Sequence, residues 1–258
     1  RLPNPREPAK YVRNSDVGGR DCASLGTSMP YESKMDNSTC VVLVPVGSSI
    51  EPNCEAGLRS LENRGYTVRR VYGYAAIDRG RSQIATDALS DGFEELMWID
   101  SDIGFDADDV DRLRNHDLPI VCGIYPKKGL RELSCYVSPG TKRLVFGEQG
   151  GLTKIHYAAT GFLLTRQQVY TDIRQKLALP LCDRRFGRGI VPYFLPMIVA
   201  DAEYGHWYLG EDYAFCERAK RVGYDIIGDT RIRLHHIGRY GYSFEDVGSE
   251  LPRFGTYN

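Results

Sequence analysis

The sequence predicts an α/β protein in which helices cover a central, mostly parallel sheet. Short apolar runs have the length and composition of buried strands, and they lie at 40–46, 66–72, 96–99 and 120–124. Segments with helical spacing of apolar residues separate these runs, so strand and helix alternate over about 85 residues. Alternation of this kind is typical of parallel sheets, because the connection between parallel strands is usually a helix.

Local signals place the ends of several of these elements. Pro52 suits the first position of a helix, and Gly65 is placed to end that helix. The next helix is expected to open near Gly80, and Asp106 is expected to cap a third one.

After residue 128 the regular alternation of predicted strands and helices ends. Strand-like pieces are expected at 133–137, 144–146, 153–157 and 161–164, and helices over Val169, Ile173 and Leu177 and at 211–222. No linker separates these pieces from the preceding part, so residues 40–258 are interpreted as a single domain. Residues 1–39 carry polar residues, Pro and Gly without a sustained apolar period, and are expected to form an N-terminal arm or extension.

Composition and charge argue against some classes of partner, although a nucleic-acid enzyme with a local basic patch stays possible. The formal net charge is -1, which gives no general attraction to nucleic acid or to anionic membranes, and no nucleic-acid partner is expected. The strongest apolar run, 190–200, is interrupted by Pro192 and Pro196, so no transmembrane segment is expected. The 7 cysteines include no C-x-x-C pair, and their odd number indicates reduced thiols in a cytoplasmic protein.

The chemistry is expected at Asp100-Ser101-Asp102, directly after the buried strand that ends at Ile99. Ligands of parallel sheets gather at the carboxyl ends of the strands. Two neighbouring carboxylates repel each other unless a cation or hydrogen bonds neutralise them, and their oxygens suit Mg²⁺ or Mn²⁺. Such a triplet alone more often marks a solvated loop, but its position after an apolar strand favours a metal site.

Further segments are ambiguous when taken singly. Arg81 lies at a basic helix start, which suits a phosphate or a base carbonyl but is also common without a ligand. The small residues before Phe162 permit close approach of a ligand or simply tight packing. Glu211-Asp212 at a helix start is ordinarily a cap or dipole partner, and His235-His236 is ordinarily one core and one surface residue.

Together and in this order, these segments resemble nucleotide-diphospho-sugar transferases of the GT-A fold, near the family-2-like branch. The resemblance covers most of the chain, from about Val41 to Tyr242. Its segments are Val44-Pro45-Val46, Arg81-Ser82, Met97 to Phe105, Gly123 to Lys128, Thr160-Gly161-Phe162, Gly210 to Tyr213 and His236-x-Gly238. Many relatives have Arg-Asn where this chain has Arg81-Ser82, so base recognition in that loop is left open.

The resemblance implies a Rossmann-like GT-A domain over residues 40–258, with a nucleotide-binding half at 40–128 and a smaller mixed-sheet acceptor half at 129–258. It implies a glycosyltransferase that moves a sugar from a nucleoside-diphosphate sugar, with UDP favoured, to a hydroxyl of a carbohydrate or another acceptor. The implied cofactor is Mn²⁺ or Mg²⁺.

The resemblance also assigns roles to residues of this chain. Nucleotide and donor contacts are implied for Pro45, Val46, Gly47, Arg81, Asp100, Ser101 and Gly161. Metal ligands are implied to be Asp100, Asp102 and His236, with His235 as the alternate. Asp212, with Glu211 as second choice, is implied to be the general base, which favours inversion.

The acceptor is expected over the second half of the chain. Tyr193 and Trp207 are the expected acceptor contacts, although core packing alone explains most aromatic residues of that stretch. Lys127, Lys128 and Arg239 are expected either to contact phosphate or to lie in solvent.

Two other classes of function stay open. A sugar nucleotidyltransferase shares such a sheet, but it normally has a Gly-rich basic loop after the first strand, and residues 45–49 contain no Lys or Arg. A non-catalytic carbohydrate-binding domain has no need of both an Asp-x-Asp triplet and a Glu-Asp helix start, and it predicts that these groups lie far apart.

Overall fold

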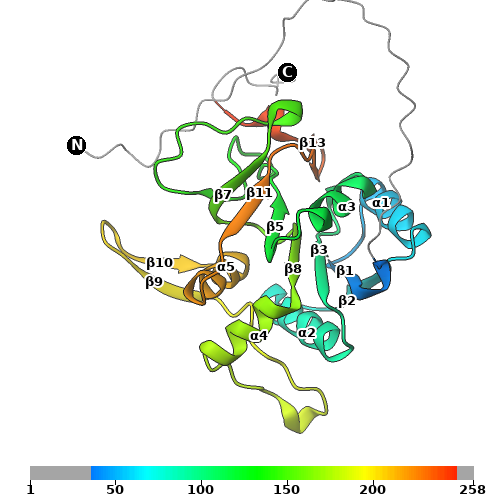
Figure 1. Ribbon diagram of the computed structural model, residues 1–258, viewed down its shortest axis with the longest axis vertical. Helices are drawn as coiled ribbons and strands as arrows, with labels where there is room; N and C mark the ends of the chain where they lie inside the picture. Colours follow the sequence, from blue (N-terminus) through cyan, green and yellow to red (C-terminus); the bar gives the residue numbers. More distant parts are fainter. Residues whose placement is uncertain (1–35, 249–258) are drawn as a thin grey trace, which may run out of the picture.

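Helices lie on both faces of a central sheet in the computed structural model, which describes residues 36–248 (Figure 1). Almost all of the expected arm at 1–39 lies outside these residues. The helices are α1 (Pro52–Asn63), α2 (Ile77–Ser90), α3 (Ala107–Asn115), α4 (Gln167–Lys176) and α5 (Glu211–Arg221). Short 3-10 helices are η1 (Asn37–Thr39), η2 (Gly147–Gln149), η3 (Arg184–Phe186) and η4 (Phe244–Asp246). No helix within 36–248 is long and apolar enough to cross a bilayer.

Within the described range the central sheet has 8 strands, in the order β2-β1-β3-β8-β5-β11-β7-β6. Their bounds are β1 (Cys40–Val46), β2 (Thr67–Tyr72), β3 (Glu95–Ile99), β5 (Ile120–Gly123), β6 (Tyr136–Val137), β7 (Leu152–Tyr157), β8 (Phe162–Arg166) and β11 (Ile226–Asp229). β1 runs parallel to β2 and β3, and β11 runs parallel to β5. β8 is antiparallel to both β3 and β5, so β3 and β5 share one direction. The mostly parallel α/β class predicted from the sequence is confirmed.

The sheet is buried on both faces. Along β1, Val41 and Leu43 pack with residues of α2, α4 and α5, whereas Val42 and Val44 pack with residues of α1 and α3. This alternation follows from the twofold repeat of side chains along a strand. It explains why the strand is apolar at every position rather than at every second one.

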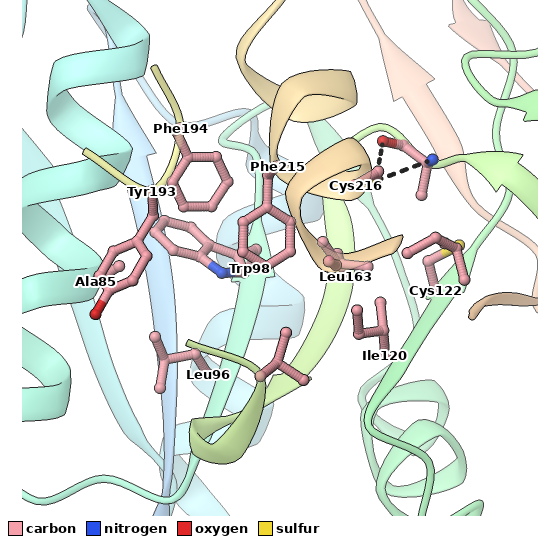
Figure 2. Packing of buried hydrophobic residues seen from close by; sticks show 14 of the residues in the cluster. Ala85, Leu96, Trp98, Ile120, Cys122, Leu163, Tyr193, Phe194, Phe215 and Cys216 are labelled. Carbon is pink, nitrogen blue, oxygen red and sulfur yellow. Dashed lines mark hydrogen bonds between the residues drawn. The ribbon is translucent and has the colours of Figure 1, made fainter. Parts of the chain in front are cut away.

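Trp98 of β3 lies at the centre of the larger core (Figure 2). Its indole N–H donates to the hydroxyl of Tyr170 over 2.9 Å. Its ring meets Phe194 edge-on with 5.2 Å between centroids, and Phe194 stacks on Phe215 at 4.7 Å. These contacts hold α5 against the sheet and thereby position the start of that helix.

Several local predictions are confirmed and others are wrong. Pro52 is the first residue of α1, and Asp106 caps α3 by accepting from the backbone N–H of Asp108. α2 begins at Ile77, before the predicted start near Gly80. Residues 144–146 form no strand, and only the last two residues of 133–137 do, because strand formation there depends on a partner that the local sequence does not specify.

A β-hairpin that the sequence did not predict begins in the apolar run at 190–200. β9 (Met197–Asp201) pairs antiparallel with β10 (Gly205–Leu209), and β10 leads directly into α5. The predicted nucleotide and acceptor halves are also interleaved, since β8 lies between β3 and β5. The division into halves stays a prediction about ligands.

Candidate active site

The ends of three strands meet at the carboxyl edge of the sheet. The backbone N–H of Asp100, just after β3, donates to the carbonyl of Gly161, just before β8, over 3.0 Å. The backbone N–H of Gly161 donates to the hydroxyl of Tyr125, which follows β5, also over 3.0 Å. A Cβ on Gly161 would lie 2.2 Å from that hydroxyl oxygen, so only glycine fits here. Tyr125 was given no role from sequence, although its position after a predicted strand placed it at this edge.

Arg81 joins this edge to the start of α5. Its side chain is only 4% exposed, and its Nη2 donates to Asp100 Oδ1 over 2.8 Å. Its Nε lies 3.7 Å from Glu211 Oε1. Burial by itself lowers the pKa of Arg81, but Asp100 and Glu211 reverse this effect and raise it. Nε and Nη1 find no hydrogen-bond partner within 36–248, so a buried cation keeps unused donors at the site.

Asp212 lies in the first turn of α5. Burial, followed by the charge of Glu211, raises the pKa of its carboxyl group to about 6, and Arg81 opposes this shift. Its Oδ1 accepts a hydrogen bond of 2.9 Å from the backbone N–H of Tyr213. A carboxyl group with this pKa exchanges protons close to neutral pH, which is the property a general base needs.

A small sheet, in the order β13-β12-β4, places the strand that contains His235 and His236 next to Asp102. β4 (Ile103–Gly104) pairs antiparallel with β12 (His235–Ile237), which also pairs with β13 (Gly241–Tyr242). The backbone N–H of Ile237 donates to the carbonyl of Asp102 over 2.7 Å. His236 Nε2 consequently lies 3.7 Å from Asp102 Oδ2. His235 pairs with Gly104 and, by the alternation of a strand, projects to the other face.

The hydrogen bond of His236 Nδ1 determines which ring nitrogen carries a proton. Nδ1 lies 2.9 Å from the carbonyl oxygen of Pro126. A carbonyl oxygen only accepts, so Nδ1 carries the hydrogen, and in the neutral ring Nε2 keeps its lone pair on the side of Asp102. Histidines that bind metals are commonly oriented in this way by a backbone carbonyl.

Asp102 also has a cationic neighbour, because Lys128 Nζ donates to Oδ2 of Asp102 over 2.5 Å. Burial by itself raises the pKa of Asp102, but the neighbouring His236 and Lys128 side chains outweigh it and lower the pKa to about 2. The Asp102 carboxylate is therefore ionised at any physiological pH.

The predicted metal ligands converge only in part. Asp102 and His236 face each other, whereas Asp100 is held by Arg81. Residues 36–248 contain no group of three or more His, Cys, Asp and Glu side chains that could hold a metal ion. Mg²⁺ is often bound by one or two carboxylates and completed by phosphate oxygens and water. An ionised carboxylate beside an oriented imidazole fits Mn²⁺ better than Mg²⁺, because imidazole is a poor ligand for the harder ion.

The loop after β1 lies next to the Asp-x-Asp loop. Pro45 and Val46 are buried, whereas Gly47 is exposed with open space around it. The backbone N–H of Glu51 donates to the carbonyl of Ser101 over 2.8 Å, which joins the two loops. Of these residues, Gly47 and Ser101 are accessible to a ligand.

The two expected acceptor residues lie in different places. Tyr193 is 3% exposed and lines a cavity of about 480 Å³ between α2 and α4, whose lining includes none of the site residues above. Trp207 of β10 is half-buried and packs edge-on against Tyr136 and Tyr157. Trp207 lies close in sequence to the start of α5, and Tyr193 belongs to the core.

Comparisons with known proteins find no matching family model and no matching curated protein. Among solved structures, A197 from STIV is 17% identical, covers 85% of this chain and 99% of that chain, and has a TM-score of 0.53, which shows a shared fold.

More distant neighbours include a pyrophosphorylase and a glycosyltransferase. A UDP-glucose pyrophosphorylase complexed with UDP-glucose is 14% identical, covers 76% of this chain and 75% of its own, and has a TM-score of 0.37. A glycosyltransferase involved in the glycosylation of the major capsid of PBCV-1 is 15% identical, covers 71% of this chain and 98% of its own, and has a TM-score of 0.29. Overlaps this low carry no argument about the activity of this chain.

Proposed function

We propose that this chain is a metal-dependent glycosyltransferase that moves a sugar from a nucleoside-diphosphate sugar, with UDP as the favoured nucleotide, to a hydroxyl group of a carbohydrate or another acceptor. One observation carries the proposal. Asp212, whose pKa is raised to about 6, interacts with the Arg81–Asp100 pair at the strand edge where Asp102 and His236 also face each other. A proton acceptor and a candidate cation site therefore occupy the same edge of the sheet.

Asp212 is the proposed general base. Its carboxylate takes the proton of the acceptor hydroxyl while the hydroxyl oxygen bonds to the anomeric carbon and the bond from that carbon to the diphosphate oxygen breaks. Attack from the side opposite the leaving group inverts the anomeric carbon. Glu211 is the second candidate for the base, but its carboxylate already lies within ion-pair distance of Arg81.

Asp102 and His236 are the residues proposed to hold Mn²⁺ or Mg²⁺. When bound, such an ion stabilises the negative charge that builds on the leaving diphosphate. The unused donors of Arg81 suit an acceptor atom of the donor molecule, and the exposed Gly47 and Ser101 are the proposed neighbours of the nucleotide.

Trp207 is the proposed acceptor contact. Its half-buried ring belongs to the strand that leads into α5, so a sugar stacked on the ring would lie on the side of the molecule where Asp212 lies in the first turn of that helix. The buried Tyr193 supports Trp98 and its neighbours from the core instead.

The Asp212→Asn substitution tests the base. Asparagine keeps the shape and can still accept the hydrogen bond from the N–H of Tyr213, but it cannot take a proton. We expect the affinity for UDP to be retained and the rate of UDP release from a UDP-sugar, in the presence of acceptor glycosides, to fall at least about 100-fold. In the parent protein, kcat/KM should fall as the pH is lowered through about 6, because protonation removes the base of the free enzyme.

Glu211→Gln is the matched comparison, because it changes the neighbouring carboxylate at the same helix start. We expect it to reduce turnover less than Asp212→Asn does. If Asp212→Asn transferred sugar at the parental rate, the assignment of the base would be wrong.

A further inference from the structure

Lys128 contacts the proposed metal site, but the proposed function assigns it no role. Its ammonium lies 2.5 Å from Oδ2 of Asp102, the same oxygen that lies 3.7 Å from His236 Nε2. The adjacent Lys127 points elsewhere and pairs with Glu132 over 2.9 Å. Only one lysine of this pair therefore reaches the Asp102 carboxylate.

The surroundings of Lys128 differ from those of its partner. The main chain at Asp102 is held by the Ile237 hydrogen bond and leads directly into β4. The Lys128 side chain is 37% exposed, and its stem lies beside Gly238, where an added Cβ would be 3.4 Å from Lys128 Cδ. The two side chains are similarly exposed, at 37% for Lys128 and 33% for Asp102. The Asp102 carboxylate is one carbon from a held main chain, however, whereas the Lys128 ammonium is at the end of a long and flexible side chain.

A divalent ion at Asp102 and His236 would face the same carboxylate oxygen as this ammonium. Two cations at one oxygen repel each other, so the binding of one disfavours the other. A displaced Lys128 ammonium would stay close to the ion, where phosphate oxygens complete the coordination of such a metal.

We infer that Lys128 is a tethered cation that neutralises Asp102 before the metal binds and moves to the diphosphate of the donor when the metal takes its place. This inference rests on the metal site of the proposed function. It adds a residue that opposes metal binding alone and favours metal and diphosphate binding together.

The experiment measures Mn²⁺ binding to the full chain by electron paramagnetic resonance, which reports the free ion without any turnover. Asp102→Asn should abolish Mn²⁺ binding, and equal binding by this variant and the parent would disprove the metal site and the inference with it. Lys128→Gln should bind Mn²⁺ roughly twofold to fivefold more tightly than the parent, the range that a partly exposed ion pair supports. The difference should shrink as salt is added.

The second half of the experiment uses inorganic pyrophosphate, which carries the diphosphate without a base. With saturating Mn²⁺, Lys128→Gln should bind pyrophosphate more weakly by roughly the same factor. Lys127→Gln is the control and should change neither affinity. Two results would contradict the proposed movement of Lys128: Lys128→Gln binding Mn²⁺ no more tightly than the parent, or Lys128→Gln binding pyrophosphate as well as the parent. If Asp102→Asn still loses Mn²⁺ in either case, the metal site itself is retained.

Discussion

Arg81 is the buried cation on which the charge balance of the site depends. Asp100, Glu211 and Asp212 all raise its pKa, and they come from the end of β3 and the start of α5. Without this guanidinium, partly buried carboxylates would face one another without a neutralising charge. Arg81 therefore acts both on folding and on the pKa of Asp212, which it lowers.

Arg81→Met removes this charge while keeping much of the apolar stem. Breaking a buried pair leaves a charge without compensation, so we expect the free energy of unfolding to fall by about 3 kcal/mol in urea titrations at neutral pH. Arg79→Met is the control, since Arg79 pairs with Asp183 and is 59% exposed, and it should cost less than about 1 kcal/mol. Equal losses for the two variants would contradict the role of Arg81.

At the scale of the element, the pairing of β4 with β12 determines which of the two histidines faces Asp102. The sequence left His235 and His236 as alternatives because adjacent residues in a strand point to opposite faces and the register was unknown. In the structure His236 pairs with Ile103 and faces Asp102, and its Nδ1 is held by Pro126.

His236→Ala and His235→Ala separate these alternatives. We expect His236→Ala to weaken Mn²⁺ binding at least about tenfold in titrations followed by electron paramagnetic resonance, because an oriented ligand is lost. His235→Ala should leave this affinity unchanged. The reverse pattern would mean that β12 pairs in a different register when the metal is bound.

At the scale of the whole molecule, ligand binding at the strand edge should stabilise the entire domain. A ligand at 100 times its Kd adds about 2.7 kcal/mol to the free energy of unfolding. For a domain of this size that corresponds to a rise in Tm of roughly 5–10 °C.

A thermal-shift panel of UDP, GDP, TDP and CDP, each with and without Mn²⁺, measures this effect. We expect one diphosphate, with UDP favoured, to raise Tm in the presence of Mn²⁺ and a chelator to remove most of the rise. Asp102→Asn should lose the metal-dependent part. Equal shifts by all four nucleotides, unaffected by chelator, would contradict a specific nucleotide site that depends on the metal.

How far the sequence predicted the fold depended on the range of the interactions involved. The bounds of β1, the start of α1 at Pro52 and the cap of α3 at Asp106 follow from local preferences and were predicted. The hairpin of β9 and β10 was missed, because Pro192 and Pro196 obscured the run and hairpin pairing depends on a partner strand.

For the candidate site too, short-range features were predicted from the sequence and long-range contacts were not. The sequence by itself determined that Asp100 and Asp102 follow a buried strand and that Asp212 starts a helix, because short-range periodicity specifies both positions. Only the tertiary structure decided that Arg81 holds Asp100, that His236 rather than His235 faces Asp102, and that Lys128 reaches the same carboxylate. The physical reason is that these contacts join segments far apart in the chain, and they exist only once strand order and register have brought the segments together.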